Sequence, residues 1–332
     1  MIEKFYLGTY TKRISQGIYS IKLDKVNKKL FDLKLEYSVN NPTYLVTSKE
    51  NIFTVSTKES LGGLTYFKNG KKIADHHSEN SGPCYIAYDE KNNFLLTANY
   101  HTASLILYEI NKDKIILLDK IIHEGKSSLG SQEKSHIHYS NFSSDKKFIV
   151  ACDLGTDSLI TYKIENKKLL KVATYKATEK SGARHLVFHP QKDIAYLICE
   201  LNASIEILNF DKINGSFTKK DGIALVENDE KKWAAAIRIT KDGKNLYASN
   251  RGKDVLLAFK IEDDGLLNHI QTIDTLGSVP RDFNLSSDDK FLLVGHQESD
   301  NLTLFERNED GRLKCIEKNI FAPEVVNIVN KN

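Results

Sequence analysis

The sequence predicts an all-β fold, a seven-bladed β-propeller whose ring is closed by the C-terminal strand joining the N-terminal blade. Three observations lead to this prediction. Strand-like segments recur in units spaced roughly 40 to 50 residues apart, which is the length of chain that a four-stranded blade requires. The units share one order of apolar strands and polar turns, and the two ends of the chain complement one another.

Six complete units share this plan. Each begins with a short apolar strand, passes through a polar turn such as DEKN or HPQKD into a second hydrophobic strand, and ends with an alternating strand that closes on an aromatic residue. Short runs of apolar residues bounded by turn residues are typical of strands. The units cover residues 44–66, 85–108, 137–162, 185–210, 237–259 and 282–305.

The two ends of the chain supply a seventh unit. Residues 5–10 match the second strand of a unit, and residues 17–23 and 30–37 match the third and fourth strands. The first strand is missing at this end, but residues 322–328, with the sequence APEVVNI, have its pattern. Pairing of this C-terminal strand with the N-terminal blade would leave no open edge between the first and last blades.

The continuity of the repeat predicts a single domain over residues 1–332, because repeats of this kind close into one ring. The chain is 40% apolar and 27% charged, with a net charge of +3. No basic run with interleaved aromatic residues occurs, which argues against a nucleic-acid partner. The opening MIEKFYLGTY has no apolar signal segment, and no stretch approaches the length of a membrane span. We therefore expect a cytoplasmic protein without a membrane partner, and the oligomeric state stays open.

Four cysteines, Cys84, Cys152, Cys199 and Cys315, form no CxxC pair. Three of them occupy apolar strand contexts, so we expect buried thiols in a reducing compartment. A nucleophilic role is the alternative for Cys84, which follows a Gly-Pro pair at the start of a strand. No partner base for this thiol is evident in the sequence.

Hairpin geometry brings distant residues to one rim of the ring. Two antiparallel strands joined by a tight turn return the chain to the edge from which it started. Arg184, at the start of a first strand, and Glu200, at the end of the next strand, should therefore share one edge. The residues expected to converge near this mouth of the central channel are His136, His138, Arg184, Glu200, Arg251 and Arg281, and neighbouring rim positions hold Asn99, Tyr100, Asp153 and Gln297.

This collection indicates a site for a small anion. Arginine suits bidentate recognition of carboxylate or phosphate, and a histidine or glutamate in such a pocket can accept a proton from an attacking water. His136 and His138 also have a spacing found in metal sites. With no third ligand evident, no metal or cofactor is predicted. No serine nucleophile motif of the GxSxG type is present.

Structural roles compete with these functional ones. Arg184 and Glu200 could form a buried ion pair that holds adjacent strands, and Asp153 could order its own loop through local hydrogen bonds. The remaining alternatives are inter-blade ion pairs of Arg251 or Arg281 with Asp254 or Asp282, a blade-to-blade contact of Asn99 and Tyr100, packing or turn roles for His185 and His189, and packing of Trp233 under the rim or against the pocket.

A series of short motifs runs along the chain: GTYT at 8–11, NPTYL at 41–45, ANY at 98–100, SHIHY at 135–139, DLGTD at 153–157, GARHLVFHP at 182–190, CEL at 199–201, SNRG at 249–252 and PRDF at 280–283. Taken in this order, the motifs resemble those of the lactonase family of seven-bladed propellers, in particular the bacterial propeller-type 6-phosphogluconolactonases. The resemblance covers essentially the whole chain, and the order and number of the motifs are specific to the family.

The resemblance implies hydrolysis of a sugar-acid lactone, most specifically 6-phospho-D-glucono-1,5-lactone, in the pentose phosphate pathway. A fungal relative that interconverts a carboxylated muconate and its lactone is assigned a His, an Arg and a Glu on the channel rim. By motif these fall on His136, Arg184 and Glu200, with Arg251 as a further rim arginine. In this scheme His136 or Glu200 accepts the proton of water, and the two arginines stabilise the oxyanion.

The other rim residues are expected to bind substrate, with Arg281 as the candidate for the phosphate: His138, Asn99, Tyr100, Asp153, Arg281 and Gln297. Two other functions remain open. One is a propeller that binds an anionic metabolite without turnover. The other is a lactonase or cycloisomerase that acts on another carboxylated lactone. The sequence does not separate phosphorylated from free lactones.

Overall fold

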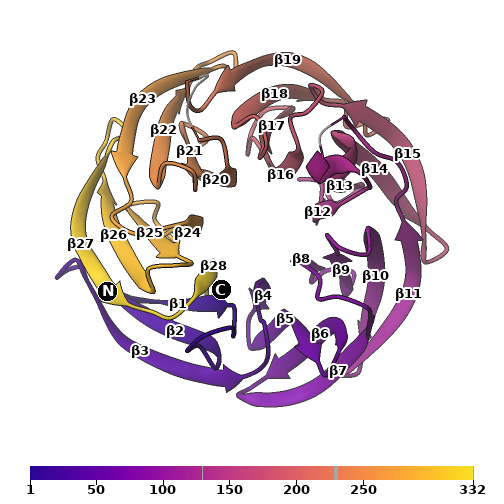
Figure 1. Ribbon diagram of the computed structural model, residues 1–332, viewed down its shortest axis with the longest axis horizontal. Coiled ribbons are helices and arrows are strands. Elements are labelled where there is room, and N and C mark those ends of the chain that lie inside the picture. Colours follow the sequence, from indigo (N-terminus) through magenta and orange to yellow (C-terminus); the bar gives the residue numbers. More distant parts are fainter. Residues whose placement is uncertain (129, 228–230, 332) are drawn as a thin grey trace.

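The computed structural model describes residues 1–128, 130–227 and 231–331 and is a ring of seven four-stranded antiparallel sheets (Figure 1). The first strand of each sheet lies nearest the axis of the ring, and the fourth lies at its circumference. The seven-bladed propeller predicted from the repeat is therefore confirmed. Strands that follow one another within a blade run antiparallel because hairpins connect them.

The blades are numbered from the N-terminus, and their strands are given from the axis outward. Blade 1 contains β28 (Val325–Asn330), β1 (Ile2–Thr9), β2 (Gly17–Asp24) and β3 (Lys29–Ser38). Blade 2 contains β4 (Leu45–Ser48), β5 (Asn51–Lys58), β6 (Leu61–Lys68) and β7 (Lys71–Glu79). Blade 3 contains β8 (Tyr85–Asp89), β9 (Phe94–Ala98), β10 (Ser104–Asn111) and β11 (Lys114–Ile122).

Blade 4 contains β12 (Ile137–Phe142), β13 (Ile149–Asp153), β14 (Ser158–Glu165) and β15 (Lys168–Lys176). Blade 5 contains β16 (Ala183–Phe188), β17 (Ile194–Cys199), β18 (Ser204–Phe210) and β19 (Phe217–Ala224). Blade 6 contains β20 (Ala234–Ile239), β21 (Asn245–Asn250), β22 (Val255–Ile261) and β23 (Leu267–Asp274). Blade 7 contains β24 (Pro280–Leu285), β25 (Phe291–His296), β26 (Asn301–Arg307) and β27 (Leu313–Phe321).

Helical structure in the described ranges is confined to two short 3-10 turns, η1 (Gly130–Gln132) and η2 (Leu154–Thr156). Both lie in blade 4, in the connection before β12 and in the loop after β13. Within these ranges, no helix has the length and apolar character needed to cross a membrane.

The C-terminal strand closes the ring. β28 pairs antiparallel with β1, and Val329 lies opposite Tyr6. This confirms the closure predicted from the sequence, although the strand begins at Val325 and not at residue 322. The preceding Glu324 has left-handed φ of 50° and donates its backbone N–H to Asp300, so the expected start of the strand is a turn anchored to blade 7.

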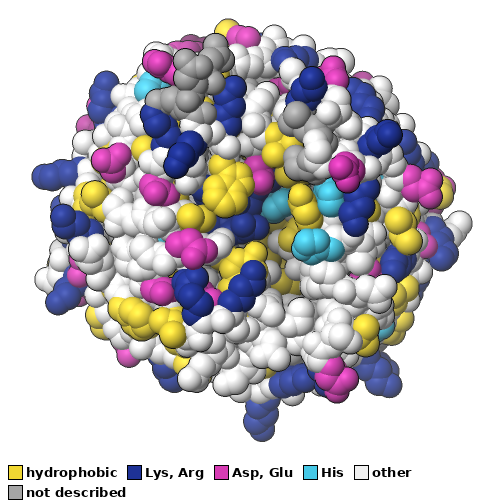
Figure 2. Space-filling view, viewed as in Figure 1, with side chains coloured by type: hydrophobic (Ala, Val, Ile, Leu, Met, Phe, Trp, Pro, Cys, Tyr) yellow, Lys and Arg dark blue, Asp and Glu magenta, His cyan; other side chains and the backbone are white. Residues whose placement is uncertain are grey.

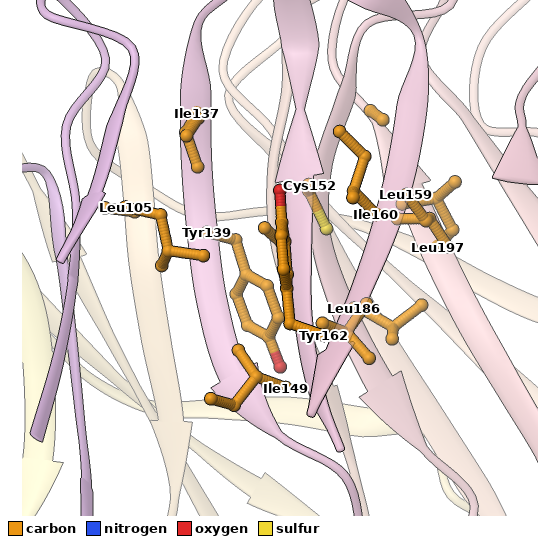
Figure 3. Packing of buried hydrophobic residues seen from close by; sticks show 14 of the residues in the cluster. Leu105, Ile137, Tyr139, Ile149, Cys152, Leu159, Ile160, Tyr162, Leu186 and Leu197 are labelled. Atoms are coloured by element: carbon orange, nitrogen blue, oxygen red, sulfur yellow. The ribbon is translucent and has the colours of Figure 1, made fainter. Parts of the chain in front are cut away.

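The core lies between the blades. Every residue of β13 and of β17 is buried, because each sheet packs face to face against a sheet on either side. This explains why the second strands are apolar almost throughout, unlike half-exposed strands that alternate. Figure 3 shows part of one such cluster on both sides of blade 4, to which Leu105 of blade 3, Leu159 of blade 4 and Leu197 of blade 5 belong.

Candidate active site

Irregular strand pairing places three predicted site residues on the axis of the ring. In blades 4, 5 and 7 the pairing between the first and second strands shifts by one residue near the start of the first strand. Each shift is a β-bulge that leaves one residue unpaired: His138 in β12, Arg184 in β16 and Arg281 in β24. Bulges can re-aim a side chain beside a functional site. All three residues line a narrow cavity of about 30 Å³ within the channel.

A larger cavity of about 420 Å³ opens above this constriction and shares His138 and Arg281 with it. Figure 2 shows a hollow at the centre of the ring, surrounded by basic, acidic and histidine side chains. The residues lining the larger cavity are Tyr10, Lys12, Asn41, Thr43, Thr57, Ser81, Gly82, Pro83, Cys84, Tyr100, His101, His138, Glu200, Trp233, Arg251 and Arg281. Its size suits a small metabolite.

Glu200 is the centre of a charge cluster. Its Oε2 accepts hydrogen bonds from Arg184 Nε at 2.7 Å and from Arg251 Nη2 at 2.8 Å. Its Oε1 accepts a hydrogen bond from Trp233 Nε1 at 3.1 Å. The predicted meeting of Arg184 and Glu200 on one edge is therefore confirmed. It is both the buried ion pair of the structural interpretation and, through Glu200, part of the cavity wall.

The arginines on Glu200 are deeply buried, with 1% of Arg184 and 4% of Arg251 exposed. Backbone carbonyls of blade 6 supply further acceptors, since Arg184 Nη1 donates to Ala235 and Arg251 Nη2 donates to Ala234. Burial alone would raise the pKa of Glu200, but Arg251 and Arg184 hold that pKa below its ordinary value. The cluster therefore contains a carboxylate and two guanidinium groups in fixed positions.

Trp233 fixes the outer arginine of this cluster. The guanidinium of Arg251 lies 4.1 Å from the centroid of the indole ring, a cation–π contact. Of the two alternatives from the sequence, the tryptophan takes the one in which it lines the pocket. Neither Asp254 nor Asp282 pairs with the rim arginines: Asp254 accepts the backbone N–H of Val279, and Asp282 binds Arg238.

The two histidines of the HIH motif both contact Tyr100 but have different partners. The ring of His136 stacks on Tyr100, with centroids 4.1 Å apart, and its Nδ1 lies 2.7 Å from the Tyr100 carbonyl oxygen. His138 meets the same tyrosine edge-on and bonds through Nδ1 to His185. His136 is not among the residues that line the cavity.

No group of three or more His, Cys, Asp or Glu side chains is placed to hold a metal ion within residues 1–128, 130–227 and 231–331. The Nδ1 atoms of the HIH pair face protein atoms: Tyr100 for His136 and His185 for His138. The spacing of the motif therefore does not correspond to a ready-made ligand set in this part of the chain.

Two cations of the cavity have no carboxylate partner among the described residues. Arg281 and Lys12 form no ion pair there, and both lie near the ring of Tyr10, at 5.9 Å and 4.3 Å from its centroid. Their charge is therefore available to an anionic ligand. Lys12 was not among the predicted site residues, although it directly follows GTYT, one of the family-like motifs.

Asn99 directly follows β9 and Asp153 is the last residue of β13, and neither lines the cavity. Asn99 Oδ1 accepts the backbone N–H groups of His101 and Thr102. Asp153 is fully buried, and its Oδ1 accepts the backbone N–H groups of His136 and Gly155. Its contacts are those of the loop-ordering alternative, and they position His136.

Gln297 does not line the cavity either. Its amide Nε2 donates to the neighbouring Glu298, and its backbone oxygen accepts from Arg13. The structure therefore does not bring this predicted substrate-binding residue to the site. Cys84 does line the cavity, but its thiol faces backbone carbonyls, and burial raises its pKa to about 11. A protonated thiol is a poor nucleophile, which argues against the cysteine alternative.

Several known proteins are similar to this chain in sequence and in fold. Residues 4–330 match the family described as lactonase, 7-bladed beta-propeller. The chain is 32% identical to the 6-phosphogluconolactonase of Bacillus subtilis, over 96% of this chain and 95% of the relative. A Lactobacillus plantarum protein of known structure superposes with a TM-score of 0.97 at 34% identity, with all of both chains covered. The periplasmic gluconolactonase of Pseudomonas aeruginosa has the same fold, with a TM-score of 0.92 at 23% identity and coverage of 100% and 99%.

Proposed function

Because the chain belongs to the family of seven-bladed β-propeller lactonases, we propose that it hydrolyses 6-phospho-D-glucono-1,5-lactone to 6-phosphogluconate. The observation that supports this substrate is the charge of the cavity. Arg184 and Arg251 share the single carboxylate of Glu200, whereas Arg281 and Lys12 have no carboxylate partner among the described residues. A ligand with a fixed phosphate and a carbonyl that develops negative charge fits both pairs. This activity would place the protein in the cytoplasmic pentose phosphate pathway.

The proposed reaction is direct attack by water. The water oxygen forms a bond to the lactone carbonyl carbon, and the carbonyl oxygen gains negative charge. When the carbonyl reforms, the bond from its carbon to the ring oxygen breaks. The ring oxygen takes up the proton that the water released and becomes a hydroxyl group, and the new carboxylic acid ionises. The cyclic ester is already reactive, so no covalent enzyme intermediate is required.

In this scheme Arg251, with Arg184 behind it, stabilises the oxyanion. Glu200 holds the two guanidinium groups in place, and both of its oxygens already accept hydrogen bonds from protein side chains. A carboxylate in that state, with its pKa lowered by the arginines, is a weak acceptor for the proton of water. We therefore assign the proton acceptor to the histidine side of the cavity.

Turnover is tested with purified protein and 6-phosphogluconolactone generated in situ, with and without a chelator. Hydrolysis well above the spontaneous rate supports the proposal. Loss of this hydrolysis when a chelator is present would show that the reaction requires a metal ion. Saturable binding of 6-phosphogluconate without acceleration of hydrolysis would instead identify a protein that binds an anionic metabolite.

The substrate class is tested with Arg281→Gln. Loss of a charge-assisted hydrogen bond to phosphate corresponds to about 2 kcal/mol, so KM for the phosphorylated lactone should rise about 10- to 100-fold. KM for unphosphorylated glucono-1,5-lactone should change little. Arg312→Gln, which removes a surface arginine paired with Asp310, is the control. Equal effects of Arg281→Gln on both lactones would contradict the phosphate assignment.

A further inference from the structure

Two histidines from neighbouring blades are in contact below the cavity. His138 Nδ1, on β12 of blade 4, lies 3.2 Å from His185 Nε2, on β16 of blade 5. Each side chain is buried, with 5% of each residue exposed. A single hydrogen atom fits between two nitrogens at this distance, so one imidazole is the donor and the other is the acceptor.

Arg184 decides which ring donates. Its Nη1 lies 3.5 Å from His185 Nε2, and a guanidinium nitrogen can donate but never accept. The same Nη1 carries a second hydrogen, which it donates to the carbonyl oxygen of Ala235. His185 Nε2 therefore faces an obligate N–H donor, Arg184 Nη1, and is the unprotonated nitrogen of its ring. The hydrogen between the two imidazoles then belongs to His138 Nδ1.

This arrangement sets the tautomer of His138. A neutral imidazole carries one ring hydrogen, so a proton on Nδ1 leaves a lone pair on Nε2. That Nε2 has no hydrogen-bond partner among the described residues, and His138 lines the cavity. Burial first, and then the charges of Arg184 and Arg281, lower the pKa of His138 well below its ordinary value, which keeps the ring neutral.

The surroundings of His185 hold its ring in place. Three tyrosines of blades 2, 3 and 4 pack around this ring. Their ring centroids lie 5.3 Å away for Tyr85 of β8, 5.7 Å for Tyr139 of β12 and 6.3 Å for Tyr44, which directly precedes β4. Burial and the charge of Arg184 also lower the pKa of His185 well below its ordinary value. Because the His185 ring is neutral and tightly packed, its Nε2 stays directed at His138 Nδ1.

We propose that His138 accepts the proton of the attacking water through Nε2, and that His185 is a positioning residue that fixes this tautomer. The proposal rests on the lactonase function proposed above and deepens it. An O–H bond of water breaks as the water oxygen bonds to the carbonyl carbon, and its proton goes to His138 Nε2. The resulting imidazolium, surrounded by arginines, is a strong acid and passes the proton to the ring oxygen as that oxygen leaves.

The tautomer can be measured without any turnover. Long-range ¹H–¹⁵N spectra of uniformly labelled protein distinguish protonated from unprotonated ring nitrogens, and His138→Gln identifies the signals of His138. We expect Nδ1–H in the wild type and in His185→Gln, whose amide oxygen can replace the acceptor. His185→Leu should shift His138 toward Nε2–H. A wild-type His138 protonated on Nε2 would overturn the proposal, whatever the activity.

Kinetics then test the role of the pair. Since a general base contributes about 100-fold or more, His185→Leu should lower kcat at least about tenfold at nearly constant KM, whereas His185→Gln should stay within about threefold of the wild type. In a His138→Ala background, His185→Leu should cause no further loss. An unchanged kcat in a folded His185→Leu protein would overturn the positioning role, and His185→Met serves if the leucine variant does not fold.

These outcomes separate two kinds of failure. If the wild type does not hydrolyse lactones but His138 carries its proton on Nδ1, the proposed function and the proton transfer fail while the tautomer assignment stands. If hydrolysis is fast and His138→Ala retains it, the lactonase function stands and the role of His138 is overturned.

Discussion

Glu200 shows how one residue can be both structural and functional. Its carboxylate joins β16, the loop after β21 and Trp233, and it leaves Arg184 and Arg251 with a fixed orientation toward the cavity. Removing one partner of a buried ion cluster leaves the others without compensation, which is far costlier than removing an exposed pair. The two interpretations considered for Arg184 and Glu200 are therefore not exclusive.

Glu200→Gln should lower the free energy of unfolding by about 3 kcal/mol, because two buried guanidinium groups lose their counter-charge. It should also lower kcat/KM for the lactone. Denaturant titration measures the first effect. Glu298→Gln, which breaks an exposed pair with Arg13, is the control and should change stability by less than about 0.5 kcal/mol. Equal stabilities of the two variants would contradict the compensating role of Glu200.

The pH dependence of kcat/KM follows from the surroundings of His138. The reactive form is the neutral imidazole, and its pKa lies well below the ordinary 6.5 because of burial and then the neighbouring arginines. Protonation therefore removes activity only when pH falls through that lowered pKa. The titratable and charged groups that face His138 are Arg184 and His185 of blade 5, Arg251 of blade 6, Arg281 of blade 7, Tyr100 of blade 3 and Cys84, which directly precedes blade 3.

We therefore expect kcat/KM, corrected for spontaneous hydrolysis, to remain level as pH is lowered through 6.5. Arg281→Gln removes one of the cations that lower this pKa, so its acid limb should move to higher pH than in the wild type. A wild-type limb centred near pH 6.5 would contradict the assignment of His138.

At the scale of single residues, the repeat predicted where a residue lies on the ring but not which way its side chain points. Aligning the units placed Arg184 and Glu200 on one edge correctly, since a hairpin fixes which ends of its strands meet. The same alignment grouped Asn99 and Gln297 with them, although their side chains are used in turns. The bulges that bring His138, Arg184 and Arg281 to the narrow cavity depend on the pairing of two strands, and no local pattern encodes that pairing.

Among the elements, the loops between second and third strands act as clamps between blades. Asp157 accepts the backbone N–H of Gly182, which leads into the next blade, and Asp254 does the same for Val279. Asp300 repeats the contact with Glu324 at the closure of the ring. Asp157, Asp254 and Asp300 all have left-handed φ between 51° and 57°, a conformation that Asp adopts more readily than most residues.

Glu324 extends this clamp to the loop that carries Lys12. Its carboxylate accepts the backbone N–H groups of Lys12, Arg13, Ile14 and Ser15. Burial alone would raise the pKa of Glu324, but these hydrogen bonds hold it below its ordinary value. The stabilisation is therefore present above the pKa of the unfolded chain and is lost as pH falls through the lower folded pKa.

Glu324→Gln should lower the free energy of unfolding by about 2 kcal/mol at neutral pH, because hydrogen bonds to a charged acceptor become bonds to a neutral one. The difference from the wild type should shrink as pH approaches the folded pKa of Glu324. Thermal melting between pH 3 and 7 measures both effects. Glu50→Gln is the matched control, since its pair with Lys331 is exposed. A difference that stays constant with pH would contradict the clamp.

The strands themselves were predictable because apolar runs and polar turns alternate in every unit. Arg184 was expected at the start of a first strand and lies in β16, which begins one residue earlier; Glu200 was expected at the end of the next strand and directly follows β17. The C-terminal strand was displaced by three residues because Ala322 and Glu324 bond to Asp300 of blade 7. That contact joins distant parts of the chain, so the local pattern of APEVVNI did not reveal it.

For the whole molecule, the apolar interfaces between neighbouring blades are the reason to predict a single domain. Each sheet buries its two faces against its neighbours, and an isolated blade would expose both. We expect one calorimetric transition with equal calorimetric and van't Hoff enthalpies. Removing residues 322–332, and with them β28, should lower the melting temperature and broaden the transition. Two separate transitions in the intact protein would contradict a single cooperative domain.

Closure by the last strand also determines when the molecule can begin to work. Chains emerge from the ribosome N-terminus first, at about 5–20 residues per second, so the segment with Tyr10 and Lys12 appears before blades 2 to 7. Its anchor, Glu324, and β28, the inner partner of β1, appear only after those blades. A nascent or prematurely terminated chain therefore has an incomplete cavity and an unprotected strand edge. Emergence of Glu324 and β28 is the event that completes the pocket, so chains that stop before this segment should be inactive.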